Sequence, residues 1–250
     1  MNKNQLKLIK SLHLKKNRTK EGLFFVEGRK NVLELVTGSF EMVEIFATRE
    51  FMDLYGRELR RFACPVTESS QKALESAGTF QSNDQALALV KLPPDTFTAP
   101  KYEGGLVLAL DDVRDPGNLG TILRIADWYG IKQVICSENT TDLFNPKVIN
   151  SSMGSFLRVQ TVYIDLVSYL ENLPSHVRSF GAFMEGDNLH KEKELPADAV
   201  LVLGNESNGI SPALEKVIGK KITIPSFGGA ESLNVATACA VICDNFRQKG

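Results

Sequence analysis

The stretch VLVLGNESNGIS, residues 200–211, begins as an unbroken apolar run and becomes polar from Gly204 onward. A run that is apolar at every position is typical of a strand covered on both faces, whereas a half-exposed strand alternates apolar with polar residues. Four more runs have this form, at residues 105–112, 132–138, 158–164 and 220–226, and most lead into a helical pattern. The sequence therefore predicts an α/β fold with a mostly parallel sheet, in which ligands bind at the carboxyl ends of the strands.

The composition is that of a globular protein with one large domain or two ordinary ones, since 43% of the 250 residues are hydrophobic and 24% are charged. The net charge is -1, but residues 1–30 carry nine Lys or Arg against two Glu, so this end of the chain is basic. No apolar stretch approaches the roughly 20 residues of a membrane span, and the opening residues lack the apolar core of a secretion signal. We therefore expect a cytoplasmic protein.

A stretch rich in proline and glycine, KLPPDTFTAPKYEGG at residues 91–105, is the best linker candidate because it has no apolar periodicity. It predicts a first domain at residues 1–95, a linker at residues 96–104 and a second domain at residues 105–250. The first domain starts as a small α/β module with a basic helical pattern, a strand, a helix and a strand, at residues 6–14, 22–28, 29–36 and 41–48.

The stretch DDVRDPGNLGTILRIADWYG, residues 111–130, predicts a turn followed by a helix in which Asn118 is a good cap. A capped, positively polarised helix start beside Arg124 suits an anion such as phosphate, although a lone helix arginine is more often simply solvated. The expected apolar stripe consists of Leu119, Ile122, Ile125, Ala126 and Tyr129, and the polar face of Thr121, Arg124 and Trp128.

The stretch at residues 200–211 is a second candidate site. Gly204 would let a ligand approach the backbone closely, and Glu206 follows at the mouth of the sheet, although such a turn also contains Gly and Asn for its dihedrals alone. Neither loop has the G-x-G-x-x-G or G-x-x-x-x-G-K-[ST] pattern, which argues against a nicotinamide dehydrogenase or a nucleotide hydrolase. The four cysteines lack paired metal spacing and the three histidines are scattered, so no metal site is predicted.

A third stretch, IPSFGGAESLNVATACAVICDNF at residues 224–246, runs from a strand through a glycine-rich loop into a helix that is apolar almost all the way round. Ser232 and Asn234 stand at the start of this helix, and either would serve as its cap. Small residues, such as Ala240 and Cys243, fill much of the face opposite the apolar stripe. We expect this helix to be covered on both sides, by its own sheet and by a partner subunit.

The three motifs follow one another as N-x-G-x-x-x-R, L-G-N-E-S-x-G, and I-P with S-L-N-V-A, and in this order they resemble the SpoU (TrmH-type) ribose methyltransferases of the SPOUT superfamily. The resemblance covers most of residues 105–247. In addition, RTKEGLFFVEGRKNVLELV at residues 18–36 resembles the ribosomal-protein-like RNA-binding domain that many rRNA-modifying members carry in front. The resemblance implies a C-terminal deep trefoil knot, S-adenosylmethionine held in that knot, and a homodimer formed through the C-terminal domain.

Matched position by position, the resemblance implies a role for each motif residue. The cofactor would be held by Leu203, Gly204, Ile224 and Leu233. The candidate catalytic residues are Asn118 and Arg124, which would meet the ribose and phosphate of the RNA, and Glu206, Ser232 and Asn234. The RNA backbone would be bound by Lys15, Lys16, Arg18, Lys20 and Arg29, together with Lys3, Lys7 and Lys10. At most one of Phe24 and Phe25, which alternate along a strand, would be exposed for base stacking.

The implied reaction is methylation of a ribose 2′-hydroxyl in RNA, and the separate front domain favours 23S rRNA. A tRNA substrate, or a non-catalytic ribosome-assembly factor on the same fold, are the alternatives. The complete set of motif residues argues against a non-catalytic factor. Because a guanidinium with a pKa above about 12 rarely releases its proton, we expect Arg124 to clamp a phosphate and not to act as the base.

Overall fold

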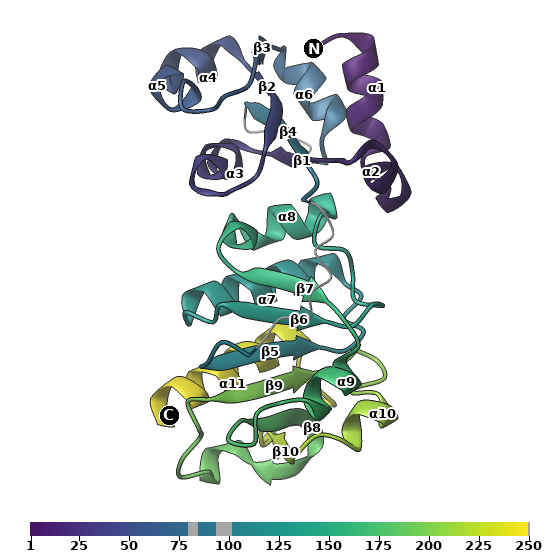
Figure 1. Ribbon diagram of the computed structural model, residues 1–250, viewed down its shortest axis with the longest axis vertical. Coiled ribbons are helices and arrows are strands. Elements are labelled where there is room, and N and C mark those ends of the chain that lie inside the picture. Colours follow the sequence, from purple (N-terminus) through teal and green to yellow (C-terminus); the bar gives the residue numbers. More distant parts are fainter. Residues whose placement is uncertain (80–84, 94–101, 250) are drawn as a thin grey trace. The chain divides into compact units, whose positions relative to one another are not determined.

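The computed structural model describes residues 1–79, 85–93 and 102–249. The chain forms two compact units, each with its own sheet (Figure 1). The first unit is Met1–Asp95 together with Asp142–Leu157, and the second is Thr96–Thr141 together with Arg158–Gly250. The sequence assigned residues 142–157 to the second domain, whereas they pack with the first unit. Most of the predicted linker, residues 96–101, lies outside the described residues.

The first unit is built on a four-stranded sheet with the order β1-β4-β2-β3. β4 is antiparallel to both β1 and β2, and β2 is parallel to β3, so the carboxyl ends of β1, β2 and β3 share one edge. The predicted strands at residues 22–28 and 41–48 are β1 and β2. The bounds are β1 Leu23–Glu27, β2 Met42–Ala47, β3 Val66–Glu68 and β4 Ala86–Lys91.

Helices cover this sheet. The core under α1 and α6 joins Ile9 and Leu74 from the helices to Phe25, Phe46 and Leu87 from the strands. The predicted basic helix over residues 6–14 corresponds to α1, which ends at Ser11, and α2 follows from Lys15. The bounds are α1 Lys3–Ser11, α2 Lys15–Glu21, α3 Arg29–Glu34, α4 Arg49–Leu54, α5 Gly56–Leu59, α6 Gln71–Ala77 and α8 Pro146–Ser152. In the described part of the chain, no helix is both long and apolar enough to cross a membrane.

Residues 142–157, which include α8, complete the core of the first unit with aromatic side chains. The ring of Phe144 packs on Phe24, with centroids 4.7 Å apart, and on Phe40 at 6.2 Å. Phe156 contacts Phe40 at 6.0 Å. Aromatic pairs at such distances are favourable beyond the area that they bury. The segment is therefore an integral part of the first unit, although it is distant from Met1–Asp95 in the sequence.

The second unit has a six-stranded sheet with the order β10-β8-β9-β5-β6-β7, and every neighbouring pair is parallel. The five predicted apolar runs are β5, β6, β7, β9 and β10. β8 was not predicted, because its outer half is exposed and its pairing with β10 shifts between Gly181 and Asp187. The bounds are β5 Leu106–Leu110, β6 Gln133–Cys136, β7 Gln160–Tyr163, β8 Arg178–Asn188, β9 Ala199–Leu203 and β10 Lys220–Thr223.

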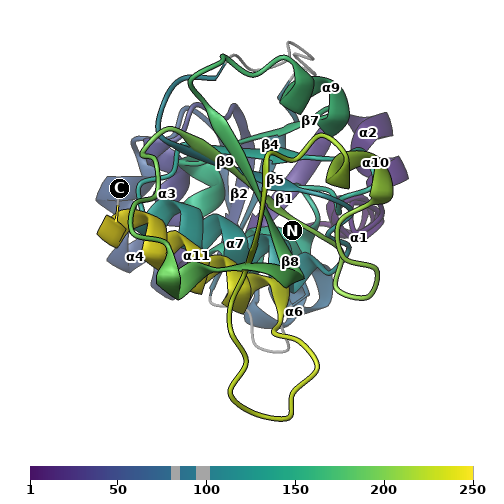
Figure 2. The ribbon, with the colours of Figure 1, turned by 90° about the horizontal axis from the view of Figure 1, so that it is seen from below.

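Both faces of the second sheet are covered. α7 (Pro116–Trp128) and α11 (Val235–Lys249) pack together on one face, and α9 (Leu166–Glu171) and α10 (Pro212–Glu215) lie on the other (Figure 2). α11 buries more of its surface within the chain than the sequence suggested. Ala236 and Cys243 are buried, so they are not available to a partner subunit, while Ala238, Ala240 and Val241 are half-exposed.

The loop between β10 and α11 extends away from the sheet (Figure 2). Residues 226–234 are all exposed, and the side chain of Phe227 is 91% exposed. Within this loop Ser226 Oγ donates to Gly228 O at 3.2 Å. The loop is held at its end by Asn234, whose backbone carbonyl accepts from Ala238 N at 2.9 Å in the first turn of α11.

Candidate active site

The start of α7 differs from the prediction in the residue that caps it. Asp115 is the N-cap, and its Oδ1 accepts from Asn118 N at 2.9 Å. Pro116 occupies the first turn, where its missing N–H is not needed. Asn118 is therefore the third residue of the helix and not its cap. Because Asp115 satisfies the helix terminus, the amide side chain of Asn118 is left to bind elsewhere.

That amide joins all three sequence motifs. Asn118 Nδ2 donates to Glu206 Oε1 at 2.7 Å, and Asn118 Oδ1 accepts from Asn234 Nδ2 at 3.0 Å. Asn234 Oδ1 in turn accepts from Ala236 N at 2.9 Å, which caps α11. We call Asn118, Glu206 and Asn234 the polar cluster. It unites three of the five candidate catalytic residues, and it offers amide donors and acceptors beside a carboxylate.

Asn205 fixes the turn that carries Glu206. Its Nδ2 donates to Asp112 O at 2.8 Å, and its Oδ1 accepts from Ser207 N at 2.9 Å and from Asn208 N at 3.0 Å. Asn205 also pairs with Gly209 through two backbone hydrogen bonds. Asn205 is not among the predicted site residues, although Asn is favoured where a side chain must bond the backbone two or three residues on.

Gly204 is required by the turn that follows it. A Cβ atom at Gly204 would lie 2.2 Å from Gly209 C and 2.3 Å from Ile210 N. The close approach that glycine permits here is therefore that of the following turn, folded back against the end of β9. The backbone of Gly204 lies at the carboxyl edge of the sheet, and its contact with a cofactor stays a prediction.

Arg124 and Ser232 are not hydrogen-bonded to the polar cluster within the described residues. Arg124 is exposed on α7, six residues after Asn118, which corresponds to about 9 Å along the helix axis. It shares the exposed face with Trp128, which is 85% exposed. Helix side chains lean toward the N-terminus, so the guanidinium can extend toward the start of α7. Ser232 is exposed in the loop, two residues before Asn234.

The four predicted cofactor residues lie at the carboxyl edge of the second sheet or in the loop after β10. Leu203, the last residue of β9, is 1% exposed, and its carbonyl accepts a hydrogen bond from Asp111 N at 2.8 Å, so its side chain does not face a ligand. Ile224 follows β10 and is half-buried, and Leu233 is 48% exposed next to Asn234. These positions combine accessible apolar side chains with the peptide groups of Leu203 and Gly204.

Most of the predicted RNA-binding side chains are exposed. Lys15, Lys16 and Lys20 project from α2, and Arg29 begins α3. Lys20 Nζ lies 3.5 Å from Glu21 Oε1, and such an exposed pair contributes little to stability. Lys3, Lys7 and Lys10 are exposed on α1.

Arg18 is the exception, and its prediction as an RNA contact is corrected. Its side chain is 3% exposed and pairs with Asp142 at 2.5 Å. Arg18 Nη1 also donates to Leu12 O at 2.8 Å and to His13 O at 3.1 Å. The residue therefore holds the first unit together. Phe24 and Phe25 are 0% and 1% exposed, so neither ring is accessible for base stacking.

The cysteines of the second unit are buried thiols. Burial raises the pKa of Cys136, and the contact with Cys243, whose Sγ is 3.8 Å away, raises the pKa of Cys239 together with burial. A raised pKa keeps these thiols protonated and makes them poor nucleophiles. Among the described residues, no group of three His, Cys, Asp or Glu side chains could hold a metal ion.

Comparison with known proteins places both units. The SpoU rRNA Methylase family matches residues 105–244, and the MRM3-like substrate binding domain matches residues 3–88. The 23S rRNA (guanosine(2553)-2'-O)-methyltransferase RlmP of Bacillus subtilis is 32% identical over 239 residues, which cover 95% of this chain and 94% of that protein.

Solved structures agree. A Porphyromonas gingivalis protein assigned to the TrmH family of RNA methyltransferases has a TM-score of 0.84 at 34% identity, covering 100% of this chain and 99% of that one. The SpoU methyltransferase AviRb of Streptomyces viridochromogenes, solved with the cofactor AdoMet, has a TM-score of 0.86 at 24% identity over 99% and 98% of the two chains. The predicted fold class, that of the SPOUT methyltransferases with a substrate-binding domain in front, is thereby confirmed. The chain belongs to the SpoU rRNA methylase family.

Proposed function

We propose that this protein transfers a methyl group from S-adenosylmethionine to a ribose 2′-hydroxyl in 23S rRNA. The observation that carries the proposal is the polar cluster, in which hydrogen bonds of 2.7 and 3.0 Å bring one residue from each of three motifs to one place. Family membership supports the same reaction, since the Bacillus subtilis relative is named as a 23S rRNA 2'-O-methyltransferase and the AviRb structure contains AdoMet.

The residues at the carboxyl edge of the second sheet fit this cofactor. Ile224 and Leu233 provide apolar surface for its adenosine and methionine parts, and the peptide groups of Leu203 and Gly204 provide hydrogen bonds. The carboxylate of Glu206 suits the positive charge of a sulfonium. When bound, S-adenosylmethionine supplies a methyl group that is already electrophilic.

The protein must align the 2′-hydroxyl with that methyl group, exclude water and allow one proton to leave. The amide of Asn118 is held from both sides, by Glu206 and by Asn234. An amide has two N–H donors and two acceptor sites. The two bonds use one of each, so Asn118 keeps one donor and one acceptor site for the ribose. Alignment of this kind can supply about 7–11 kcal/mol of a barrier. We assign the orientation of the hydroxyl to Asn118 and Ser232, and its proton leaves late.

Arg124 has a separate role in this proposal, as a clamp on the phosphate beside the target ribose. It is exposed on the second half of α7, about 9 Å along the helix axis from Asn118, and the N-terminus of this helix carries a partial positive charge. A planar guanidinium can donate two parallel hydrogen bonds to a phosphate, and it also stabilises the developing negative charge of the hydroxyl oxygen.

The first unit would recruit the RNA. Lys15, Lys16, Lys20 and Arg29 are exposed on it, and cations of this kind bind the phosphate backbone with an affinity that falls steeply with salt. We propose residues 1–95 as the RNA substrate-binding domain and residues 105–250 as the methyltransferase domain, with the packing of residues 142–157 on the first unit as the exception.

Three further features are part of the proposal. A homodimer through the second unit is supported by the exposed Trp128 on α7 and the half-exposed Ala238 and Val241 on α11. A deep trefoil knot in the C-terminal segment rests on membership of the family. A cytoplasmic location accords with the proposed rRNA substrate.

The experiment that tests the proposed function is transfer of radiolabelled methyl from S-adenosylmethionine to purified bacterial rRNA and, separately, to tRNA. Label entering 23S rRNA is the expected result. Label entering tRNA alone would show that the substrate is tRNA and not 23S rRNA. No label in either RNA, despite measurable cofactor binding, would favour a non-catalytic assembly factor.

A further inference from the structure

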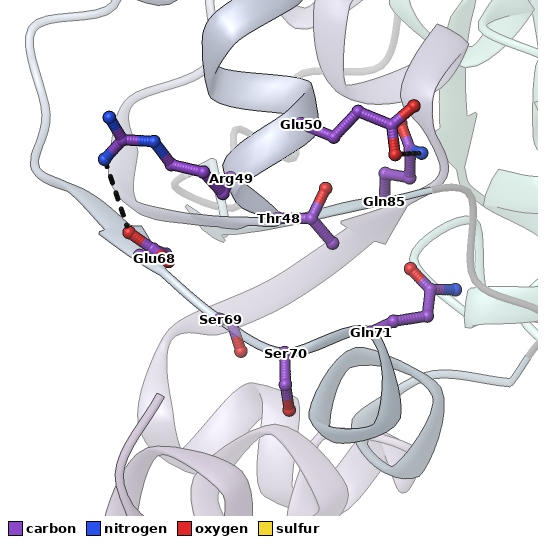
Figure 3. A pocket seen from close by; sticks show the side chains of 8 residues that line it. All are labelled: Thr48, Arg49, Glu50, Glu68, Ser69, Ser70, Gln71 and Gln85. Carbon is purple, nitrogen blue, oxygen red and sulfur yellow. Dashed lines mark hydrogen bonds and ion pairs between the residues drawn. The ribbon is translucent and has the colours of Figure 1, made fainter.

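A polar hollow of about 570 Å³ opens at one edge of the sheet in the first unit (Figure 3). It lies where β2 and β3 end and β4 begins, and ligands of α/β folds gather at such carboxyl ends. The residues that line it are Thr48, Arg49, Glu50, Glu68, Ser69, Ser70, Gln71 and Gln85.

The hollow is connected to the proposed RNA-binding edge by backbone hydrogen bonds. Gly28, which precedes Arg29, donates to Ala86 O at 3.0 Å, and Thr48 N donates to Gln85 O at 3.0 Å. Ser69 N continues the row by donating to Ala47 O at 2.8 Å. Arg29 and the hollow therefore follow neighbouring strands along the same edge of the sheet.

Two of the lining residues, Ser69 and Gln85, have features that are unfavourable for the stability of the fold. Ser69 is 8% exposed, and its Oγ has no hydrogen-bond partner among the described residues. A buried hydroxyl without a partner destabilises a fold. Gln85 has a φ of 67°, a left-handed conformation that is rare for residues other than glycine. Unpaired buried groups and strained backbone tend to occur where binding requires them.

The charges of the lining decide which part of an RNA fits. Arg49 opposes two carboxylates, Glu50 and Glu68, so the hollow has a net charge of −1 and disfavours a phosphate. Gln85 Nε2 donates to Glu50 Oε2 at 3.0 Å, and Arg49 Nη1 lies 3.7 Å from Glu68 Oε2. Figure 3 shows both pairs at the hollow. A carboxylate accepts about four hydrogen bonds, so both retain capacity for N–H donors of a base.

We propose that this hollow binds one unpaired guanosine of the substrate RNA, an assignment that rests on the proposed RNA-modifying function. The Watson–Crick edge of guanine presents two adjacent N–H donors, N1 and N2, which match the two oxygens of Glu50. Adenine offers an acceptor at N1, which a carboxylate repels. Unpaired bases are commonly read on this edge by single-strand RNA-binding proteins.

The test is fluorescence anisotropy of the full chain with heptamers of adenosine that carry a central guanosine, inosine or adenosine. We expect guanosine to bind about tenfold tighter than adenosine, with inosine between, because inosine lacks the N2 donor. Glu50→Gln should reduce the preference to less than twofold and leave the affinity for the all-adenosine heptamer unchanged. Glu58→Gln is the matched control, since both glutamates lie in the first turn of a short helix.

Ser69→Ala distinguishes binding from folding. Removal of its unpaired hydroxyl should leave the Tm unchanged or higher while the guanosine preference falls. Equal affinity of the wild type for all heptamers, or a preference retained by Glu50→Gln, would overturn the proposal. A lower Tm with an unchanged preference would assign Ser69 to the fold and contradict its role in binding.

Methyl transfer in the same variants separates this proposal from the proposed function. Glu50→Gln should raise the KM for 23S rRNA and leave kcat unchanged. If the wild type transfers methyl groups but shows no guanosine preference, only the proposal that the hollow binds guanosine is refuted. A guanosine preference without methyl transfer would refute the proposed function and leave the hollow in place.

Discussion

Asn118 Nδ2 donates a hydrogen bond to Glu206 Oε1 at 2.7 Å, although the two residues are 88 positions apart in the sequence. The register of the sheet explains this contact. β5 and β9 are parallel neighbours in which Leu110 lies opposite Leu203, so the loops that follow the two strands begin side by side. A methyl-transfer site that depends on this contact should respond to changes in either loop.

Replacement of Asn118 by alanine should lower kcat for methyl transfer by about 100-fold, the size of effect seen when one pre-organised hydrogen-bond donor is removed. The free energy of unfolding should change by less than about 0.5 kcal/mol, because the side chain is near the surface and the helix cap is Asp115. Single-turnover rates and thermal melts measure the two effects. Asn208→Ala, in the turn after β9, is the control, and an Asn118→Ala rate within twofold of wild type would exclude the proposed role.

Asn234 caps α11 and also donates to Asn118, and two substitutions separate these functions. Asn234→Asp keeps an acceptor for the helix start but loses the donor, so stability should be retained while methyl transfer falls. Asn234→Ala loses both and should cost about 1 kcal/mol, a decrease in Tm of about 2–4 °C. Equal melting temperatures for the two variants would contradict the capping role.

Gly204→Ala should destabilise the protein by about 1–3 kcal/mol, because the added methyl would overlap the backbone of Gly209 and force the turn to shift. Gly229→Ala is the matched control, since a Cβ there meets nothing within 4 Å. Urea unfolding compares them. Equal stability of the two variants would show that the turn after β9 shifts at little cost, and it would contradict the predicted destabilisation.

Arg18→Gln should lower the free energy of unfolding by about 3–5 kcal/mol, because it leaves the partly buried Asp142 without its partner. Lys16→Gln should leave stability unchanged and reduce the salt dependence of RNA binding by about one phosphate contact. Chemical denaturation and a salt titration of RNA affinity measure these effects. A stable Arg18→Gln variant with weakened RNA binding would restore the original prediction for Arg18.

The pKa of Asp198 is lowered, first by the hydrogen bond from Gly105 N at 2.7 Å and then by that from the Tyr102 hydroxyl at 2.9 Å. Its contribution to stability is therefore present above its unfolded pKa of about 3.9 and is lost as the pH falls through the lower folded value. Asp198→Asn does not titrate, so its stability should fall less steeply below about pH 4 than that of the wild type. Identical pH profiles in urea unfolding between pH 5 and pH 3 would contradict this.

The parts of the fold that could be predicted are those with a strong one-dimensional pattern. β5 and β9 are apolar throughout because helices cover both faces, and the sequence identified them and their parallel arrangement. β8 was not predicted from the sequence because its outer half is exposed and lacks an unbroken apolar run. The exposed face of α7 was predicted correctly, but its cap was not, since Asp115 and Asn118 are both good capping residues.

The candidate site was predicted through its motifs, and the structure adds which members touch. Periodicity cannot show that Asn118 bonds both Glu206 and Asn234, because that contact depends on sheet register. A run of basic residues likewise does not reveal that Arg18 points inward to Asp142. The hollow around Ser69 and Gln85 had no sequence signal, because it arises where three separate loops meet.

The most direct measurement is the identity of the labelled nucleoside after 23S rRNA is incubated with S-adenosylmethionine and either the wild type or Asn118→Ala. Complete digestion and chromatography should yield one 2′-O-methylated nucleoside, resistant to alkali at its linkage, from the wild type and almost none from the variant. A methyl group on a base, or equal yields from the two proteins, would contradict the assignment of ribose methylation to the polar cluster.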